Sequence, residues 1–173
     1  MPTQVASAEL SPPHVLDPES LGDHIDRLFR AASALCRSRE DAEDLVQETY
    51  ARVLARPRLL RKENDLGYLL RVMRNSFISR RRAASSRPKT AGPDPEALNL
   101  PERQPDTAGS QGREAIGAIR ALPAEFRDAV IAVDVAGLSY REAAKALGVR
   151  PSTIGTRLFR ARNEVADSLQ EGI

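Results

Sequence analysis

The segment from Gly137 to Arg162, GLSYREAAKALGVRPSTIGTRLFRAR, carries the residue types and spacing that best fit a defined chemistry, the binding of nucleic acid. Between Glu142 and Glu164 the chain has five basic residues and no acidic one. Such an excess of cations suits a polyanionic partner. A helical hairpin with an ordinary basic surface is the alternative interpretation.

Local signals divide this segment into two short helices. Ser139 and Glu142 form a capping-box pattern, in which each side chain satisfies a free amide at a helix start. Gly148 stands where a helix C-terminus favours a left-handed residue, and Pro151 suits the first turn of the next helix. Two helices with so short a connection predict a helix-turn-helix.

The second of these helices has two contrasting sides when drawn at about 100° per residue. One side is apolar and predicts a core face: Ile154, Leu158, Ala161 and Val165. The opposite side carries Ser152, Thr156, Phe159, Arg160 and Asn163. An aromatic ring beside hydroxyls and an arginine suits a major groove, where Arg reads guanine and apolar atoms touch the thymine methyl.

Composition narrows the fold class and excludes several functions. Of the 173 residues 4 % are aromatic, and no strand-like alternation with hairpin turns is present, so we predict an all-α chain. The single Cys36 excludes an internal disulfide, and one Cys with two His predicts no metal site. A Gly-rich phosphate loop and a nucleophile–base arrangement are lacking, which argues against an enzyme and predicts no cofactor.

The chain shows no targeting pattern that we recognise. No apolar run approaches the roughly 18 to 20 residues of a membrane span, and no basic-then-apolar signal pattern opens the sequence. We therefore expect a cytoplasmic, nucleoid-associated protein.

Proline and glycine divide the chain into four parts. Residues 87–112 hold five of the twelve prolines and three of the ten glycines, which predicts a flexible linker. The expected order is a flexible tail over 1–20, a helical domain over 21–86, this linker, and a second helical domain over 113–173. Each folded part has about 60 residues, a size at which one core is marginally stable, so a larger partner is plausible.

A helix is predicted from the Ser38–Asp41 capping pattern to about Arg56. Its core face comprises Ala42, Leu45, Val46, Thr49 and Val53. The other face carries Glu40, Asp44, Gln47 and Ala51, with Glu48 on its flank. Composition alone favours a solvated acidic face; the alternative is a docking stripe for a basic partner helix.

The next predicted helix runs from about Leu66 to Ala84 and is strongly basic. Seven basic residues and no acidic one lie between Leu66 and Pro93, more than capping of a helix C-terminus requires. One flank aligns Tyr68, Arg71, Asn75 and Arg82, with Ser79 at its edge. An aromatic ring among cations suits single-stranded DNA, because unpaired bases stack on rings while cations follow the backbone.

Three segments in this order resemble bacterial RNA polymerase sigma factors. EDAEDLVQETYARVL (40–54) resembles region 2.2, GYLLRVMRNSFISRRR (67–82) resembles regions 2.3 and 2.4, and the segment from Gly137 to Arg162 resembles region 4.2. Two helical domains joined by a linker resemble the extracytoplasmic-function (ECF, group IV) subfamily of the sigma-70 family. The resemblance covers about residues 21 to 170.

The resemblance implies a promoter-specificity subunit that binds core RNA polymerase, recognises the −35 and −10 promoter elements and promotes DNA melting. It implies partners in the β′ coiled coil and β flap of the polymerase, in promoter DNA and in an anti-sigma factor. The core-binding residues it implies are Asp44, Leu45, Gln47 and Glu48. The implied −10 residues are Tyr68, Arg71, Arg74, Asn75, Ser79, Arg80, Arg81 and Arg82, and more loosely the loop 58–65. The implied −35 residues are Ser152, Thr153, Thr156, Arg157, Phe159, Arg160 and Arg162, with Arg157 and Arg162 on phosphates.

Two points qualify these expectations. The family usually has Trp at the place of Tyr68, so the stacking area is smaller here. The competing hypothesis is a stand-alone helix-turn-helix regulator, which would bind duplex DNA alone, usually as a dimer on paired half-sites.

Overall fold

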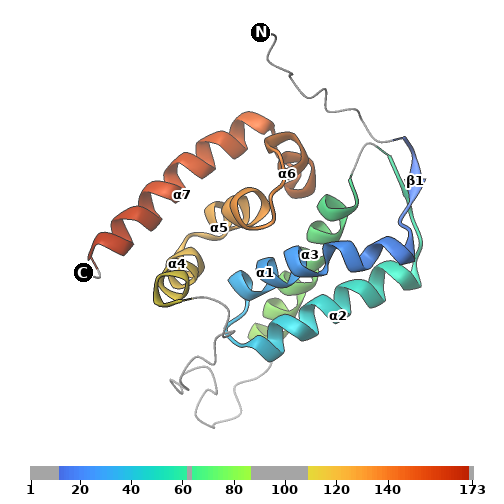
Figure 1. Ribbon diagram of the computed structural model, residues 1–173, viewed down its shortest axis with the longest axis horizontal. Helices are drawn as coiled ribbons and strands as arrows, with labels where there is room; N and C mark the ends of the chain where they lie inside the picture. The colour runs from blue at the N-terminus through green and yellow to red at the C-terminus, as the bar shows by residue number, and fades with distance from the viewer. Residues whose placement is uncertain (1–11, 62–63, 87–108, 172–173) are drawn as a thin grey trace.

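The computed structural model describes residues 12–61, 64–86 and 109–171. In these residues two groups of helices lie against each other (Figure 1). The first group comprises β1 (His14–Val15), the 3-10 helix η1 (Pro18–His24), α1 (Ile25–Leu35), α2 (Arg39–Ala55), β2 (Leu59–Leu60) and α3 (Asp65–Ser86). The second comprises α4 (Ser110–Ala121), α5 (Ala124–Val130), the π-helical turn η2 (Ile131–Val135), α6 (Tyr140–Leu147) and α7 (Pro151–Glu171). The predicted all-α class is confirmed. The described residues also contain a two-stranded ribbon, β1 with β2, which was not predicted.

Helices α1, α2 and α3 pack around one apolar core, because each contributes a fully buried stripe. Leu28 of α1, Leu45 of α2, and Leu69 and Met73 of α3 are all almost inaccessible. The Ser38 hydroxyl accepts a hydrogen bond from the Asp41 amide at 3.1 Å, so α2 begins as predicted. It ends before Pro57, as expected for a residue that precedes a proline.

The expected flexible tail over residues 1–20 is corrected from Pro12 onward. β1 pairs antiparallel with β2, so that His14 lies opposite Leu60 and Val15 opposite Leu59. Leu16 is buried, and the Asp17 carboxylate accepts from the Glu19 amide at the start of η1. The proline-rich composition concealed this order, because the strand partner lies some 45 residues away. Residues 1–11 lie outside the described part.

The helix-turn-helix forms as its local signals predict. The Ser139 hydroxyl accepts from the Glu142 amide at 3.2 Å, and the Glu142 carboxylate accepts from the Ser139 amide at 2.7 Å. Gly148 has φ +68°, the left-handed conformation expected after α6, and α7 begins at Pro151. Ile154, Leu158 and Ala161 are fully buried, which places their side of α7 in the core.

The linker predicted over residues 87–112 extends too far at its C-terminal end, because the amphipathic helix α4 already begins at Ser110. Its residues 87–108 lie outside the described part. In the described residues, α4 packs on α7 and on α1, and α6 packs on α3. The first and second groups of helices therefore share an interface along α3 and α1.

Two glycine substitutions should shift stability in opposite directions. Gly148→Ala should lower the free energy of unfolding by about 1 kcal/mol or more, because an L side chain is strained at this positive φ. Gly117→Ala, inside α4 with open space around its added Cβ, should raise it by up to about 1 kcal/mol. Denaturant unfolding of both variants measures this; the same sign for both would contradict the assignment of Gly148 as the helix end.

Candidate nucleic-acid and protein interfaces

The outer side of α7, which carries the predicted −35 residues, is accessible to solvent. Phe159 is 69 % exposed, an unusual position for a large aromatic ring. Ser152, Thr156 and Arg160 are exposed beside it, while Thr153 is half-buried. The structure therefore brings the predicted −35 residues together on one side of a helix whose other side is core.

The three arginines of this helix differ in their partners. Arg162 makes a bidentate pair with Asp134 at 2.6 and 3.0 Å, and Arg157 pairs with Glu125 at 3.3 Å. Arg160 has no hydrogen-bond or ion-pair partner among the described residues. Arg160 and Phe159 are thus the side chains available without breaking an existing interaction.

The acidic face of α2 is only partly available. Asp44 and Gln47 are exposed, as expected of a docking stripe. Leu45 is fully buried and belongs to the core, as its helical spacing predicted, so it presents no side-chain surface to a partner in this conformation. Glu48 forms ion pairs with Arg52 of the same helix at 2.7 Å and with Arg80 of α3 at 2.5 Å. The pair with Arg80 joins α2 to α3.

The basic flank of α3 changes character along the helix. From Asn75 onward this flank is open: Asn75, Ser79, Arg81 and Arg82 are exposed. Its N-terminal half is not. Tyr68 is only 8 % exposed, with Arg71 lying over its ring at 5.5 Å. The expected stacking platform is therefore closed in this conformation, because an amphipathic Tyr gains more from packing than from exposure.

Arg74 and Arg80 each bind a carboxylate. Arg74 donates to Asp128 of α5 at 2.6 Å, and Arg80 donates to Glu48 at 2.6 Å and to the Asp44 carbonyl at 3.3 Å. Arg80 thereby links the implied −10 set to the implied core-binding set. The sequence pattern gave no sign of these pairs, since their members are 54 and 32 residues apart.

Arg127 of α5 is a functional candidate that the sequence did not reveal. Its guanidinium lies over the Phe77 ring at 5.7 Å, and Arg81 lies over the same ring at 5.8 Å. Burial lowers the pKa of Arg127, and the nearby Arg81 and Arg74 lower it further, against the opposing effect of Asp128. Positive charge is thus concentrated where α3 meets α5, a setting that attracts an anion.

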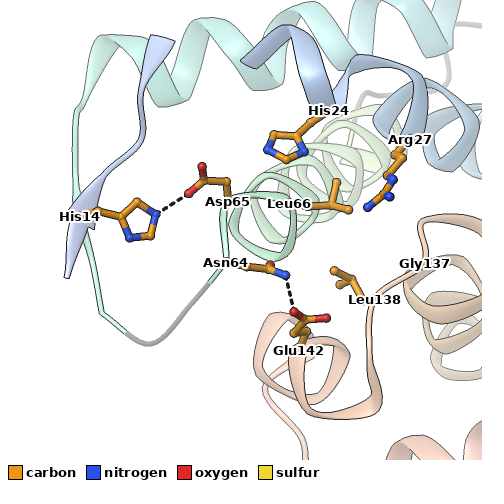
Figure 2. Close-up of a pocket in the computed structure, with 9 residues that line it drawn as sticks. All are labelled: His14, His24, Arg27, Asn64, Asp65, Leu66, Gly137, Leu138 and Glu142. Carbon is orange, nitrogen blue, oxygen red and sulfur yellow. Dashed lines mark hydrogen bonds and ion pairs between the residues drawn. The ribbon is translucent and has the colours of Figure 1, made fainter. Parts of the chain in front are cut away.

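A pocket of about 380 Å³ lies where the start of α3 faces α6 (Figure 2). Residues from both groups of helices line it: His14, His24, Arg27, Asn64, Asp65, Leu66, Gly137, Leu138 and Glu142. The Asn64 amide donates to Glu142 at 2.7 Å, and its oxygen accepts from the Gly67 amide at 2.7 Å. Within the described residues, no cluster of three or more His, Cys, Asp and Glu is arranged to hold a metal.

Known proteins identify the two groups of helices. The family model for Sigma-70 region 2 matches residues 21–87, and the model for Sigma-70 region 4 matches residues 112–165. ECF RNA polymerase sigma factor SigM of Mycobacterium tuberculosis is 30 % identical over 167 residues, which cover 93 % of this chain and 83 % of SigM. The chain belongs to the ECF sigma factor family.

Other ECF sigma factors are similarly close. SigE of Mycolicibacterium smegmatis is 33 % identical over 155 residues, 87 % of this chain, and the chain spans 60 % of that relative's length. The structure is similar to that of the sigma factor RpoE from Bartonella quintana, solved in complex with the anti-sigma factor NepR. That comparison has a TM-score of 0.64 at 25 % identity and covers 88 % of this chain and 95 % of RpoE.

Among the helices that the structure describes in this ECF sigma factor, none combines the length and the apolar composition of a membrane span.

His14 should make the stability of the ribbon dependent on pH. Its ring nitrogen contacts the Asp65 carboxylate at 2.5 Å, and this hydrogen bond, with one to the Pro12 carbonyl, raises the pKa of His14 above its ordinary 6.5. A raised folded-state pKa stabilises the fold below pH 6.5, and that contribution is lost as pH rises through the folded value.

We therefore expect the free energy of unfolding to fall as the pH rises from 6.5 through the raised pKa of His14. The substitution His14→Gln should remove this fall. His24→Gln is the matched control, because His24 lines the same pocket and, among the residues the structure describes, makes no hydrogen bond to a carboxylate. Thermal unfolding across this pH range is the measurement. An unchanged pH dependence in His14→Gln would show that the pair does not contribute.

Proposed function

We propose that this ECF sigma factor selects promoters through two separate surfaces, with α7 on the −35 element and α3 with its preceding loop on the −10 element. The observation that carries the proposal is the exposed reading side of α7 with Phe159 at its centre. An exposed aromatic ring contributes no burial free energy to folding, whereas a major groove offers it contact with thymine methyl groups. The domains proposed for the two surfaces are those predicted over residues 21–86 and 113–173, the first extended to include β1 and the second to include the start of α4 at Ser110.

On the −35 element, the proposed base-reading groups are Arg160 and Phe159, supported by Thr156 and Ser152. Arg160 has five donors in a fixed fork and no competing carboxylate among the described residues, which suits guanine O6 and N7. Arg157 and Arg162 already hold carboxylates on the rim of this surface. We propose that these two arginines contact DNA phosphates, because a phosphate can replace the carboxylate that each of them now binds.

On the −10 element, the proposed contacts are strongest where α3 is exposed. Arg81, Arg82, Asn75 and Ser79 offer cations and polar groups to a single strand. Arg71 and Arg74 extend this surface toward the loop, where Arg58 and Arg61 are also exposed. Tyr68 serves to hold Arg71 in place as long as its ring stays buried.

The acidic face of α2, with Asp44 and Gln47, is the proposed contact with the β′ coiled coil of core polymerase. Its exposed carboxylate suits a basic partner helix, while Arg80 and Arg52 fix the neighbouring Glu48. Region 4 is proposed to rest on the β flap. Nothing in the comparisons supports the alternative of a stand-alone regulator, and we propose a non-catalytic, cytoplasmic initiation factor.

An anti-sigma factor is a further proposed partner. The support is that RpoE of Bartonella quintana, a structural relative, was solved in complex with NepR. Cofactors and metal ions have no part in this proposal.

Charge reversal on α2 should separate polymerase binding from folding. Asp44→Arg should weaken association with core RNA polymerase by about tenfold or more, because it places like charge against a basic helix. Asp26→Arg, an exposed reversal on α1, is the control and should bind normally. Co-purification with core polymerase and circular dichroism measure both; normal co-purification of a folded Asp44→Arg protein would contradict the docking surface.

Substitution of Arg160 should change −35 preference. Arg160→Ala should remove about 1 to 3 kcal/mol of discrimination at one base pair, because a bidentate contact is lost. Arg160→Lys keeps the charge but not the fork, so it should retain salt-dependent affinity while losing the same discrimination. Binding to a set of −35 duplex variants tests this, and an unchanged preference in Arg160→Ala would refute base reading.

A further inference from the structure

The −10 loop, residues 58–61 and 64–65, leads from α2 into α3 and is paired with a strand from the N-terminal side of the chain. β1 runs antiparallel to β2, and His14 lies opposite Leu60. The exposed Arg58 and Arg61 flank β2 directly and belong to the proposed −10 surface. Pairing with β1 therefore constrains the backbone that carries these two arginines.

The ribbon of β1 and β2 is anchored to the core of the first group of helices. A two-stranded ribbon alone is only marginally stable in water. Leu60 of β2 is 2 % exposed, and Leu16 and Leu21, which follow β1, are buried as well. The Tyr50 hydroxyl of α2 donates to the Leu21 carbonyl at 2.8 Å, which holds η1 on α2. β1 is therefore a fixed support for the −10 loop.

His14 connects β1 to the start of α3 through its imidazole ring (Figure 2). Its Nε2 lies 2.5 Å from the Asp65 carboxylate, and its Nδ1 lies 2.9 Å from the Pro12 carbonyl. Both partners are acceptors, so both ring nitrogens must donate, which only the protonated imidazolium can do. Deprotonation of His14 therefore removes one of the two hydrogen bonds.

Asp65 is an anion at the border of a cationic surface. Seven basic residues and no acidic one follow it up to Pro93, and it lies in the first turn of α3. An unpaired carboxylate at this place repels the phosphates of a bound strand. The side chains of His14 and Asp65 are 32 % and 22 % exposed, so water screens their interaction only in part. Protonated His14 thus makes this end of the −10 surface more favourable for a polyanion.

A loop that is ordered before binding also loses less conformational entropy when DNA binds. Such preorganisation increases affinity without any new contact to the ligand. The family model for Sigma-70 region 2 begins at residue 21, so β1 lies before the matched residues. The family resemblance in the sequence therefore gave no sign of this support.

We propose that β1 holds the −10 loop in its DNA-binding arrangement and that protonated His14 is the positioning residue, acting through Asp65. This inference rests on the proposed function, since it requires that the −10 loop contact DNA. It adds a pH dependence, because −10 binding weakens when His14 loses its proton. The other charged or titratable side chains that line the pocket around His14 are His24 of η1, Arg27 of α1 and Glu142 of α6.

Substitution of His14 tests the proposal in the complex with core RNA polymerase. The wild-type complex should bind a fluorescent −10 non-template oligonucleotide about fivefold or more tightly below pH 6.5 than above the raised pKa of His14. His14→Gln should bind weakly over the whole range, because glutamine keeps a donor but carries no charge. His24→Gln, the control for the other imidazole of the pocket, should keep the wild-type pH profile. Circular dichroism and association with core polymerase show whether each variant is folded.

A double-mutant cycle through Asp65 distinguishes positioning from a general loss of structure. Asp65→Asn removes the anion, so its −10 affinity should no longer depend on the protonation of His14. Adding His14→Gln to Asp65→Asn should then change −10 affinity by less than about twofold. A general weakening of the fold would instead make the effects of the two substitutions add.

The outcomes separate this inference from the proposed function. A wild-type −10 affinity and pH profile in His14→Gln, or full additivity of the two substitutions, would overturn the positioning role. If His14→Gln does not fold, Asp65→Asn decides: loss of the pH dependence supports the role, and its persistence overturns it. Failure of the wild-type complex to bind the −10 oligonucleotide at any pH would instead overturn the proposed function.

Discussion

Burial of one side of α3 against α1 and α2 is the constraint on which the remaining structure depends. Leu69 and Met73 are inaccessible and belong to the same hydrophobic core as Leu28 of α1 and Leu45 of α2. Each such side chain contributes roughly 1.5 to 3 kcal/mol when buried, so the rotation of α3 about its axis is firmly set. That rotation decides which charged residues face outward.

The outward side of α3 then serves several purposes at once. Arg80 turns back to Glu48 and fastens α3 to α2, whereas Arg81 and Arg82 remain exposed. Arg74 donates a hydrogen bond to Asp128 of the second group of helices. One rigid helix therefore connects the proposed polymerase-binding face of α2, the proposed −10 surface and the contact with α5.

Sequence reasoning succeeded where the signals are local. The capping box at Ser139 and Glu142, the left-handed Gly148 and the helix start at Pro151 all lie within a few residues of the structure they specify. The core face of α2 followed from helical spacing in the same way, including the burial of Leu45. The family resemblance rests on these same segments, and the comparisons confirm it.

Sequence reasoning failed where the decisive partner is distant in the chain. The strand pairing of residues 14–15 with 59–60, the burial of Tyr68 and the Arg74–Asp128 pair all depend on the tertiary fold. The run of arginines in α3 has no acidic neighbour in the sequence and was therefore predicted to bind DNA. In the structure, Arg74 binds a carboxylate 54 residues away in the chain, and Arg80 binds one 32 residues away. The site residues implied by the resemblance remain predictions for that reason.

Run-off transcription shows whether this protein directs core RNA polymerase to promoters. A promoter library is transcribed by purified core RNA polymerase with and without this protein. We expect transcripts that require the protein and arise from templates sharing one −35 and one −10 element. Absence of such transcripts, together with tight duplex binding by the protein alone, would contradict it.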